Sequence, residues 1–161
     1  VGSLEDIRKA KEYLNLAKEQ LKERKQQFDE QIRIGIMIEI PAIALIADLA
    51  AEEGDFASIG SNDLTQYLSA ADRMNPEVAA YYKSDSTAML RLLGFVFREF
   101  SKREKEISVC GEMAGNPETA QLLVGLGARK LSMSSGNIAG VKAKLAECTL
   151  QELTALAEKK L

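Results

Sequence analysis

The 161-residue sequence contains no histidine and no tryptophan, and cysteine and proline are scarce. Histidine is the commonest general base near neutral pH and a frequent ligand of zinc, so any chemistry here must use carboxylates, thiols, hydroxyls, amides or guanidinium groups. The two cysteines occupy different contexts, since Cys110 ends an apolar run and Cys148 lies in a helical stretch. We therefore expect two free thiols and no disulfide framework.

The sequence also lacks an excess of positive charge and a long apolar run. Its formal net charge is −3, whereas proteins that bind the phosphate backbone usually carry net positive charge. No segment approaches the ~20 apolar residues that a membrane span requires, and the first residues do not form a secretory signal. Hydrophobic residues make up 46% of the chain and charged residues 28%, which is ordinary for a folded domain. We expect one cytoplasmic domain over residues 1–161, with no nucleic-acid or membrane partner.

Hydrophobic periodicity predicts a mixed α/β fold. Residues 1–31 form one long helical pattern, with Leu4, Ile7 and Leu14 among its apolar positions. The predicted strands are residues 32–41, 56–60, 107–110 and 130–134, and the predicted helices between and after them are residues 42–52, 63–74, 86–106, 117–127, 138–147 and 149–161. This order is typical of parallel strands joined by crossover helices, as in half of an eight-stranded βα barrel or in an open doubly wound sheet.

Polar residues lie at the carboxyl end of every predicted strand. They are Glu39 at the end of the first, Asn62 and Asp63 after the second, Cys110 and Glu112 at and after the end of the third, and Ser132 and Ser134 around the fourth. The carboxyl ends of parallel strands share one edge of the sheet, where loops and helix N-termini form the ligand sites of α/β proteins. We therefore expect these side chains at one common site.

Glu39 and Asp63 are the candidate metal ligands. Glu39 interrupts an apolar run, and a buried carboxylate needs a positive partner, which is either a Lys or Arg of a neighbouring element or a cation. Two carboxylates without histidine suit octahedral Mg²⁺ or Mn²⁺, whose remaining positions are filled by water and substrate oxygens, and they disfavour zinc.

The other candidates have structural interpretations beside the functional ones. Asn62 and Asp63 precede a predicted helix, so they are either its N-cap or, with the exposed amides of its first turn, part of a phosphate site. Arg73 lies about three turns further along the predicted helix, or just beyond its end, and taken alone it is typical of a surface residue. Cys110 is either a small core side chain or a thiol that gives up a proton at the open end of its strand.

Four segments, in this order, resemble one family. They are IGIMIEIPAIALIAD, FASIGSNDLTQYLSAADRMNPEVA, CGEMAGNPE and LSMS. Together they resemble the C-terminal, phosphoenolpyruvate-binding domain of enzyme I of the bacterial sugar phosphotransferase system. Pyruvate phosphate dikinase and phosphoenolpyruvate synthase are similar over the same region, although CGEMAG is more similar to enzyme I. The resemblance implies the C-terminal half of a TIM-type barrel, with its site at the carboxyl ends of the strands.

The resemblance also implies an activity and a set of site residues. Enzyme I uses Mg²⁺ and phosphoenolpyruvate to phosphorylate a histidine on its own N-terminal domain, and the phosphoryl group passes to a small phosphocarrier protein for sugar uptake. Glu39 and Asp63 would be the Mg²⁺ ligands, Asn62 with Asp63 would contact the substrate phosphate, and Arg73 would neutralise phosphate charge. Cys110 would donate a proton to C3 of the pyruvate enolate.

Several features of the family are missing or altered. The chain has no phosphorylatable histidine and nothing that resembles the first half of the barrel, and the segments KSDSTA (83–88) and ISV (107–109) depart from the family pattern. An isolated half-barrel would expose apolar strand faces and open edges, so we expect a homodimer that lacks full turnover. Three alternatives stay open: a non-catalytic half-barrel used for assembly or regulation, a fragment of a dikinase- or synthase-type barrel, and a lyase or aldolase of the same superfamily.

Overall fold

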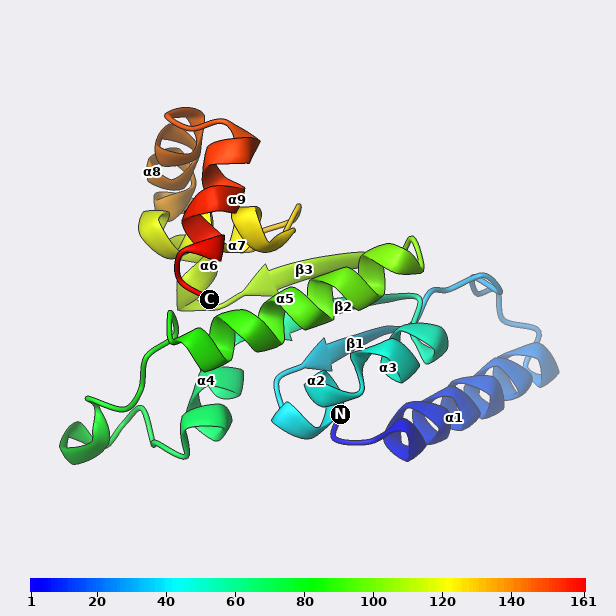
Figure 1. Cartoon of the computed structure of the whole chain (residues 1–161). Helices are drawn as coiled ribbons and strands as arrows, with labels where there is room; N and C mark the ends of the chain where they lie inside the picture. The colour runs from blue at the N-terminus through cyan, green and yellow to red at the C-terminus, as the bar shows by residue number, and fades with distance from the viewer.

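A three-stranded parallel β-sheet lies at the centre of the computed structural model, which describes residues 1–161 (Figure 1). The strands are β1 (Gly35–Ile38), β2 (Phe56–Gly60) and β3 (Glu106–Cys110), adjacent in this order. Both pairs keep a continuous register, from Gly35 opposite Phe56 to Gly60 opposite Cys110. The predicted α/β fold with parallel strands is confirmed.

The fourth predicted strand, residues 130–134, forms only an isolated bridge. Leu131 pairs with Val109 in the parallel direction, and the Ser132 N–H donates to the Val109 carbonyl at 2.8 Å. The chain then enters a helix at Ser135, so it leaves the sheet edge before a ladder can extend. The segment lies beside β3, but the prediction of a full strand was wrong.

Helices follow each strand and make up most of the remaining chain. Their bounds are α1 (Leu4–Glu23), α2 (Pro41–Leu45), α3 (Ala47–Glu53), α4 (Ser61–Ser69), the 3₁₀ helix η1 (Pro76–Val78), α5 (Thr87–Lys102), α6 (Glu112–Gly115), α7 (Pro117–Leu126), α8 (Ser135–Ala146) and α9 (Leu150–Glu158). The segment predicted as one helix over residues 42–52 is divided at Ile46, where the backbone leaves helical geometry. Pro117 begins α7, as expected for a proline in the first turn.

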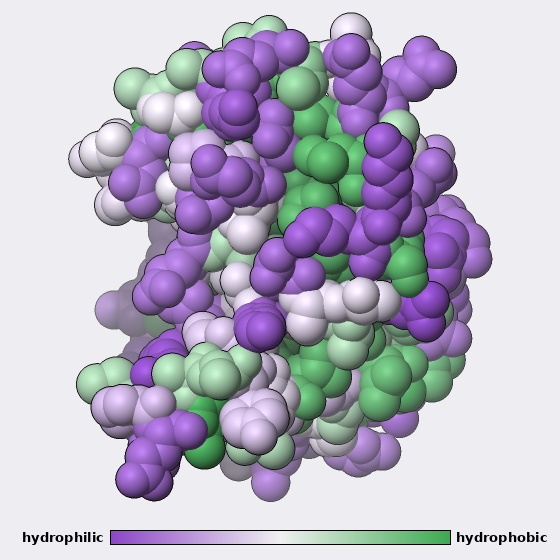
Figure 2. Space-filling model, turned by 60° about the vertical axis from the view of Figure 1, so that its left-hand side comes forward, coloured by the Kyte–Doolittle hydropathy of each residue, from purple (hydrophilic) through white to green (hydrophobic).

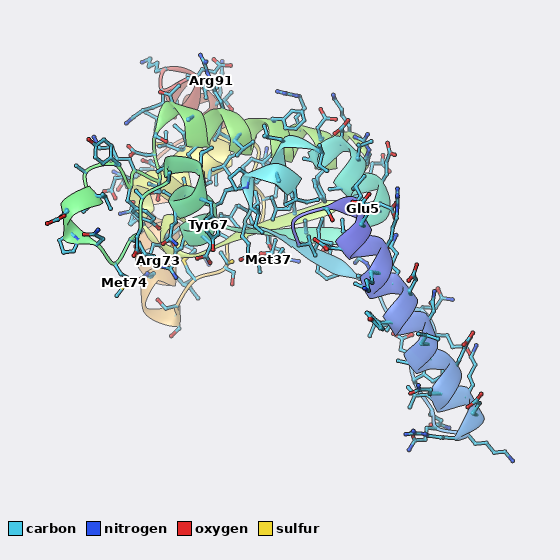
Figure 3. All side chains as sticks on the ribbon, turned by 90° about the horizontal axis from the view of Figure 1, so that it is seen from below. Glu5, Met37, Tyr67, Arg73, Met74 and Arg91 are labelled. Atoms are coloured by element: carbon cyan, nitrogen blue, oxygen red, sulfur yellow. The ribbon has the colours of Figure 1, made fainter.

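Helix α1 is shorter than predicted, and only its beginning joins the body of the molecule. Ser3 and Asp6 form a reciprocal capping box at its start. Residues 24–31 are not helical, because Lys25 adopts a left-handed conformation with φ 54° that ends the helix. Ile7 is the one buried residue of α1, and the helix projects away from the sheet in Figure 3.

One face of the sheet is covered by α2, α3 and α5, which lie along it in Figure 1. Ile38, Ile59 and Val109, one from each strand, have no exposed surface. The α5 side chains Leu93 and Val96 are likewise fully buried, as the helical pattern predicted. Each such side chain contributes about 1.5–3 kcal/mol relative to an exposed one, so the hydrophobic core lies between this face and its helices.

The opposite face of the sheet is largely open. Met37 is 38% exposed and lies on the side away from α5 in Figure 3. A cavity of about 670 Å³ runs along this face and is lined in part by Phe56, Ser108, Lys130 and Met133. The side chains that alternate with the buried positions of β1, β2 and β3 therefore face solvent.

Apolar side chains also reach the surface away from the sheet. Leu45 is 65% exposed and Leu49 is 42% exposed. Figure 2 shows hydrophobic residues gathered in a band between hydrophilic ones on the face that it presents. No helix has both the length and the apolar character required to cross a membrane.

Candidate functional site

Strand register brings Glu39 and Cys110 to the same end of the open face. Gly60 is paired with Cys110, and Ile38, the residue before Glu39, is paired with the residue before Gly60. Paired residues of parallel strands point to the same face. A Cβ atom built on Gly60 would lie 2.9 Å from both Cβ and Oε2 of Glu39. Glu39 therefore packs over Gly60, and Cys110 flanks Gly60 on the other side.

The Cys110 thiol lies at the carboxyl end of β3 and is half-buried. Its Sγ donates a hydrogen bond to the Ile59 carbonyl at 3.4 Å, and its own carbonyl accepts one from Ser61 Oγ at 2.7 Å. A backbone carbonyl can only accept, so this contact needs the proton on sulfur. The thiol thus contacts β2 at the carboxyl end of the open face.

Asn62 and Asp63 lie in the first turn of α4 rather than at its N-cap. The helix begins directly after β2, and the cap position falls on Gly60, so the predicted capping role of either residue was wrong. Asn62 Oδ1 instead accepts a hydrogen bond from the backbone N–H of Glu112 at 2.9 Å. This bond fixes the loop after β3 against α4 and leaves the Asn62 amide NH₂ as the available donor.

Gly111 is required for this close approach of the loop to α4. Its φ is +94°, which glycine adopts without the steric penalty of a side chain. A Cβ atom built on Gly111 would lie 2.5 Å from Ser61 Oγ and 2.8 Å from Asn62 Oδ1. The loop that follows Cys110 therefore owes its position to glycine.

Arg73 reaches back to the beginning of α4. The predicted helix over residues 63–74 ends at Ser69, because Ala70 has a left-handed conformation with φ 50° and reverses the chain. Arg73 Nη1 then lies 3.3 Å from Asp63 Oδ1, and each side chain is 39% exposed. Of the two predicted placements of Arg73, the one just beyond the helix is confirmed, and the structure brings Arg73 to Asp63, with which the family resemblance grouped it.

Tyr82 is a site residue that the sequence did not indicate. Its hydroxyl donates to the Asn62 carbonyl at 3.1 Å. Burial raises the pKa of the Tyr82 hydroxyl, the negative charge of Glu112 adds to this, and Arg73 opposes both. A tyrosine in a polar loop gives little sign of such contacts, because they depend on a residue 20 positions earlier in the chain.

Glu39 is half-buried and has no ion-pair partner within 4.0 Å, since none of the salt bridges of the molecule includes it. The alternative in which a Lys or Arg neutralises Glu39 is therefore not realised. No group of three or more His, Cys, Asp or Glu side chains gathers in a metal-binding arrangement. Carboxylate oxygens such as those of Glu39 and Asp63 are the type of ligand that Mg²⁺ takes, one or two at a time, with water and ligand oxygens completing its shell.

Two further predicted residues border the same end of the sheet. Ser132 and Ser134 line a small cavity of about 240 Å³, together with Asn62, Glu112 and Asn137. The polar residues that follow β2, β3 and the bridge segment thus meet there. Cys148 lies elsewhere, against Gln121, which agrees with a structural role.

Comparison with known proteins identifies the class. Residues 1–150 match the family described as PEP-utilising enzyme, PEP-binding domain, and the chain belongs to this family. This agrees with the resemblance carried by the segments around Glu39, Asp63 and Cys110.

Curated relatives share the family at 39–44% identity. The multiphosphoryl transfer protein 2 of Escherichia coli is 44% identical over 152 residues, which are 94% of this chain and 18% of that protein. The phosphoenolpyruvate-protein phosphotransferases of Priestia megaterium and Bacillus subtilis are each 39% identical, over 95% and 99% of this chain and 27% and 28% of their own lengths. The chain therefore spans less than a third of each of these relatives.

Proposed function

We propose that this chain is the metal- and phosphoenolpyruvate-binding part of a phosphoenolpyruvate-protein phosphotransferase. The observation that carries the proposal is the convergence of Glu39 and Cys110 on either side of Gly60, at the carboxyl end of an open parallel sheet. Membership of the PEP-binding family supports the choice of substrate. The names of the relatives support the reaction class.

In this proposal two acidic residues bind Mg²⁺, and Arg73 binds the phosphate of the substrate. Glu39 and Asp63 are the protein ligands of the metal. Arg73 and the Asn62 amide bind phosphate oxygens, for which Arg73 must share or exchange its present contact with Asp63. When bound, Mg²⁺ stabilises the negative charge that develops on phosphoryl and enolate oxygens.

Cys110 is the proposed proton donor. When the phosphoryl group leaves phosphoenolpyruvate, the remaining enolate becomes pyruvate by gaining a proton at C3. The Cys110 thiol supplies that proton from the open face, and the resulting thiolate regains one from water. The phosphoryl acceptor is a histidine outside these residues, and a phosphocarrier protein follows it in the transfer.

We further propose that the sheet is the C-terminal half of a TIM-type barrel. The parallel β1–β2–β3 order, the adjacent bridge segment and the uncovered face support this arrangement. The exposed Met37 and Leu45 support self-association of the isolated chain as a homodimer. Its mass in solution tests this directly, since a value of 17.6 kDa corresponds to the monomer.

A titration with Mg²⁺ and phosphoenolpyruvate, followed by thermal unfolding, tests the function. A ligand at about 100 times its Kd stabilises the folded state by about 2.7 kcal/mol, so the melting temperature should rise clearly. Glu39→Gln should abolish the rise, because the neutral amide replaces one of the two carboxylates proposed to bind the metal. Glu5→Gln, on the exposed side of α1, is the matched control and should behave as the wild-type chain.

A non-catalytic assembly module predicts the opposite result. Such a chain would show no stabilisation by Mg²⁺ and phosphoenolpyruvate, and Glu39→Gln would change nothing. A stabilisation that survives Glu39→Gln would also contradict the proposed metal site.

A further inference from the structure

Tyr82 joins two parts of the chain that the proposed site requires. Its hydroxyl donates to the Asn62 carbonyl in the first turn of α4. Burial and the charges of Glu112 and Asp63 raise the pKa of this hydroxyl, and the charge of Arg73 lowers it. The Tyr82 hydroxyl thus contacts the start of α4, where these charged residues also act on it.

The Arg73 segment has few other attachments. Arg73 follows the left-handed reversal at Ala70, outside any helix, and its backbone N–H donates to Gln66 Oε1 at 3.2 Å. Its guanidinium is held by Asp63 alone among the acidic side chains. Because an exposed ion pair contributes little by itself, the position of Arg73 needs a further constraint.

Tyr82 supplies that constraint through both its ring and its hydroxyl. The ring is half-buried, whereas the adjacent Tyr81 is 70% exposed. The hydrogen bond to Asn62 ties the loop of residues 70–86 to α4, and the same loop carries Arg73, which pairs with Asp63 of α4.

We propose that Tyr82 is a positioning residue: its hydroxyl holds the first turn of α4 and the Arg73 loop in the arrangement that binds a metal-associated phosphate. The inference rests on the proposed function and adds a residue to it. Tyr82 acts through Asn62, Asp63 and Arg73 and touches no reacting atom in this scheme.

The test compares Tyr82→Phe with Tyr81→Phe in the full chain. Each variant loses one hydroxyl and keeps its ring, but only Tyr82 uses the hydroxyl in a hydrogen bond. Binding of phosphoenolpyruvate at saturating Mn²⁺ is measured by calorimetry, and unfolding of the ligand-free variants is measured on the same samples. Losing one hydrogen bond should weaken binding to Tyr82→Phe by about two- to tenfold, and Tyr81→Phe should bind as the wild-type chain.

The affinity of the folded protein is the decisive readout. A merely structural role would lower the unfolding midpoint of Tyr82→Phe and leave the affinity of its folded fraction unchanged, which overturns the inference. Equal losses in both variants would overturn it as well, because the effect would not depend on the hydrogen bond. A wild-type chain that binds no phosphoenolpyruvate with Mn²⁺ would overturn the proposed function, and this inference with it.

Discussion

The two faces of the sheet use the same strands for different purposes. On the covered face, Ile38, Ile59 and Val109 are fully buried under helices. On the open face, the alternate positions end in Glu39 and Cys110, which keep a free carboxylate and a thiol near solvent. Because successive strand residues point to opposite faces, one short segment can stabilise the fold and present reactive groups.

Polarity alone does not identify the site. The open face also carries Ser58 and Ser108, whose positions away from the strand ends bring them no charged neighbours at bonding distance. Glu39 and Cys110 differ from them by lying at the carboxyl end, where α4 and the loop after β3 add polar groups. Position along the strand, together with the face, separates the candidate site from ordinary exposed surface.

The largest expected effect comes from breaking the covered face. Ile59→Ala should lower the free energy of unfolding by about 2–5 kcal/mol, because it removes buried methyl groups and leaves a cavity in the core. Ser58→Ala, the neighbouring substitution on the open face, should change it by no more than about 0.5 kcal/mol. Urea denaturation of both variants checks the contrast, and similar losses would mean that the two faces do not differ as described.

A second experiment sharpens the role of the open end. Arg73→Gln should free Asp63 from its ion pair, so that Mn²⁺ alone binds more tightly, while phosphoenolpyruvate at saturating Mn²⁺ binds about tenfold more weakly through loss of a charge-assisted contact. Calorimetry of the two ligands measures both changes. Arg91→Gln, which alters an exposed arginine of α5 bonded to the Leu161 carbonyl, is the control. Changes of the same sign for both ligands would contradict the ion-pair exchange.

The smallest expected effect is on the pH dependence of stability and concerns Glu99 of α5, one of the helices on the covered face. A hydrogen bond from Lys102 lowers the pKa of Glu99, burial raises it, and a hydrogen bond from Arg103 lowers it further. The pKa of Glu99 is therefore below its ordinary value. A lowered folded-state pKa stabilises the fold above the unfolded pKa, and this contribution is lost as the pH falls through the folded value.

Glu99→Gln should therefore reduce the loss of thermal stability on acidification below about pH 5. Melting curves from neutral to acidic pH measure this slope. Glu12→Gln, which removes a carboxylate of α1 that takes part in no ion pair, should keep the wild-type slope. A Glu99→Gln curve parallel to that of the wild-type chain would show that these ion pairs add nothing to the pH dependence.

Much of the sheet could be predicted because its signals are local. Short, mostly apolar runs indicated β1, β2 and β3 from the sequence. The prediction of a strand at residues 130–134 was wrong, because a strand needs partner backbone along its length and α8 begins too soon. The roles of Glu39, Asn62, Asp63, Arg73 and Cys110 remain predictions for the experiments above.

The surroundings of the site could not be predicted in the same way. Arg73 meets Asp63 because Ala70 takes a left-handed conformation, which alanine rarely adopts and which no local pattern announces.

The sequence by itself determined the parallel α/β pattern, the polar strand ends and the family, because periodicity and motifs are properties of neighbouring residues. Only the tertiary structure decided that Glu39 stays unpaired, that Arg73 and Tyr82 join the first turn of α4, and that one face of the sheet stays open. These features depend on which distant segments come into contact, and the free energy of such contacts depends on how the whole chain packs.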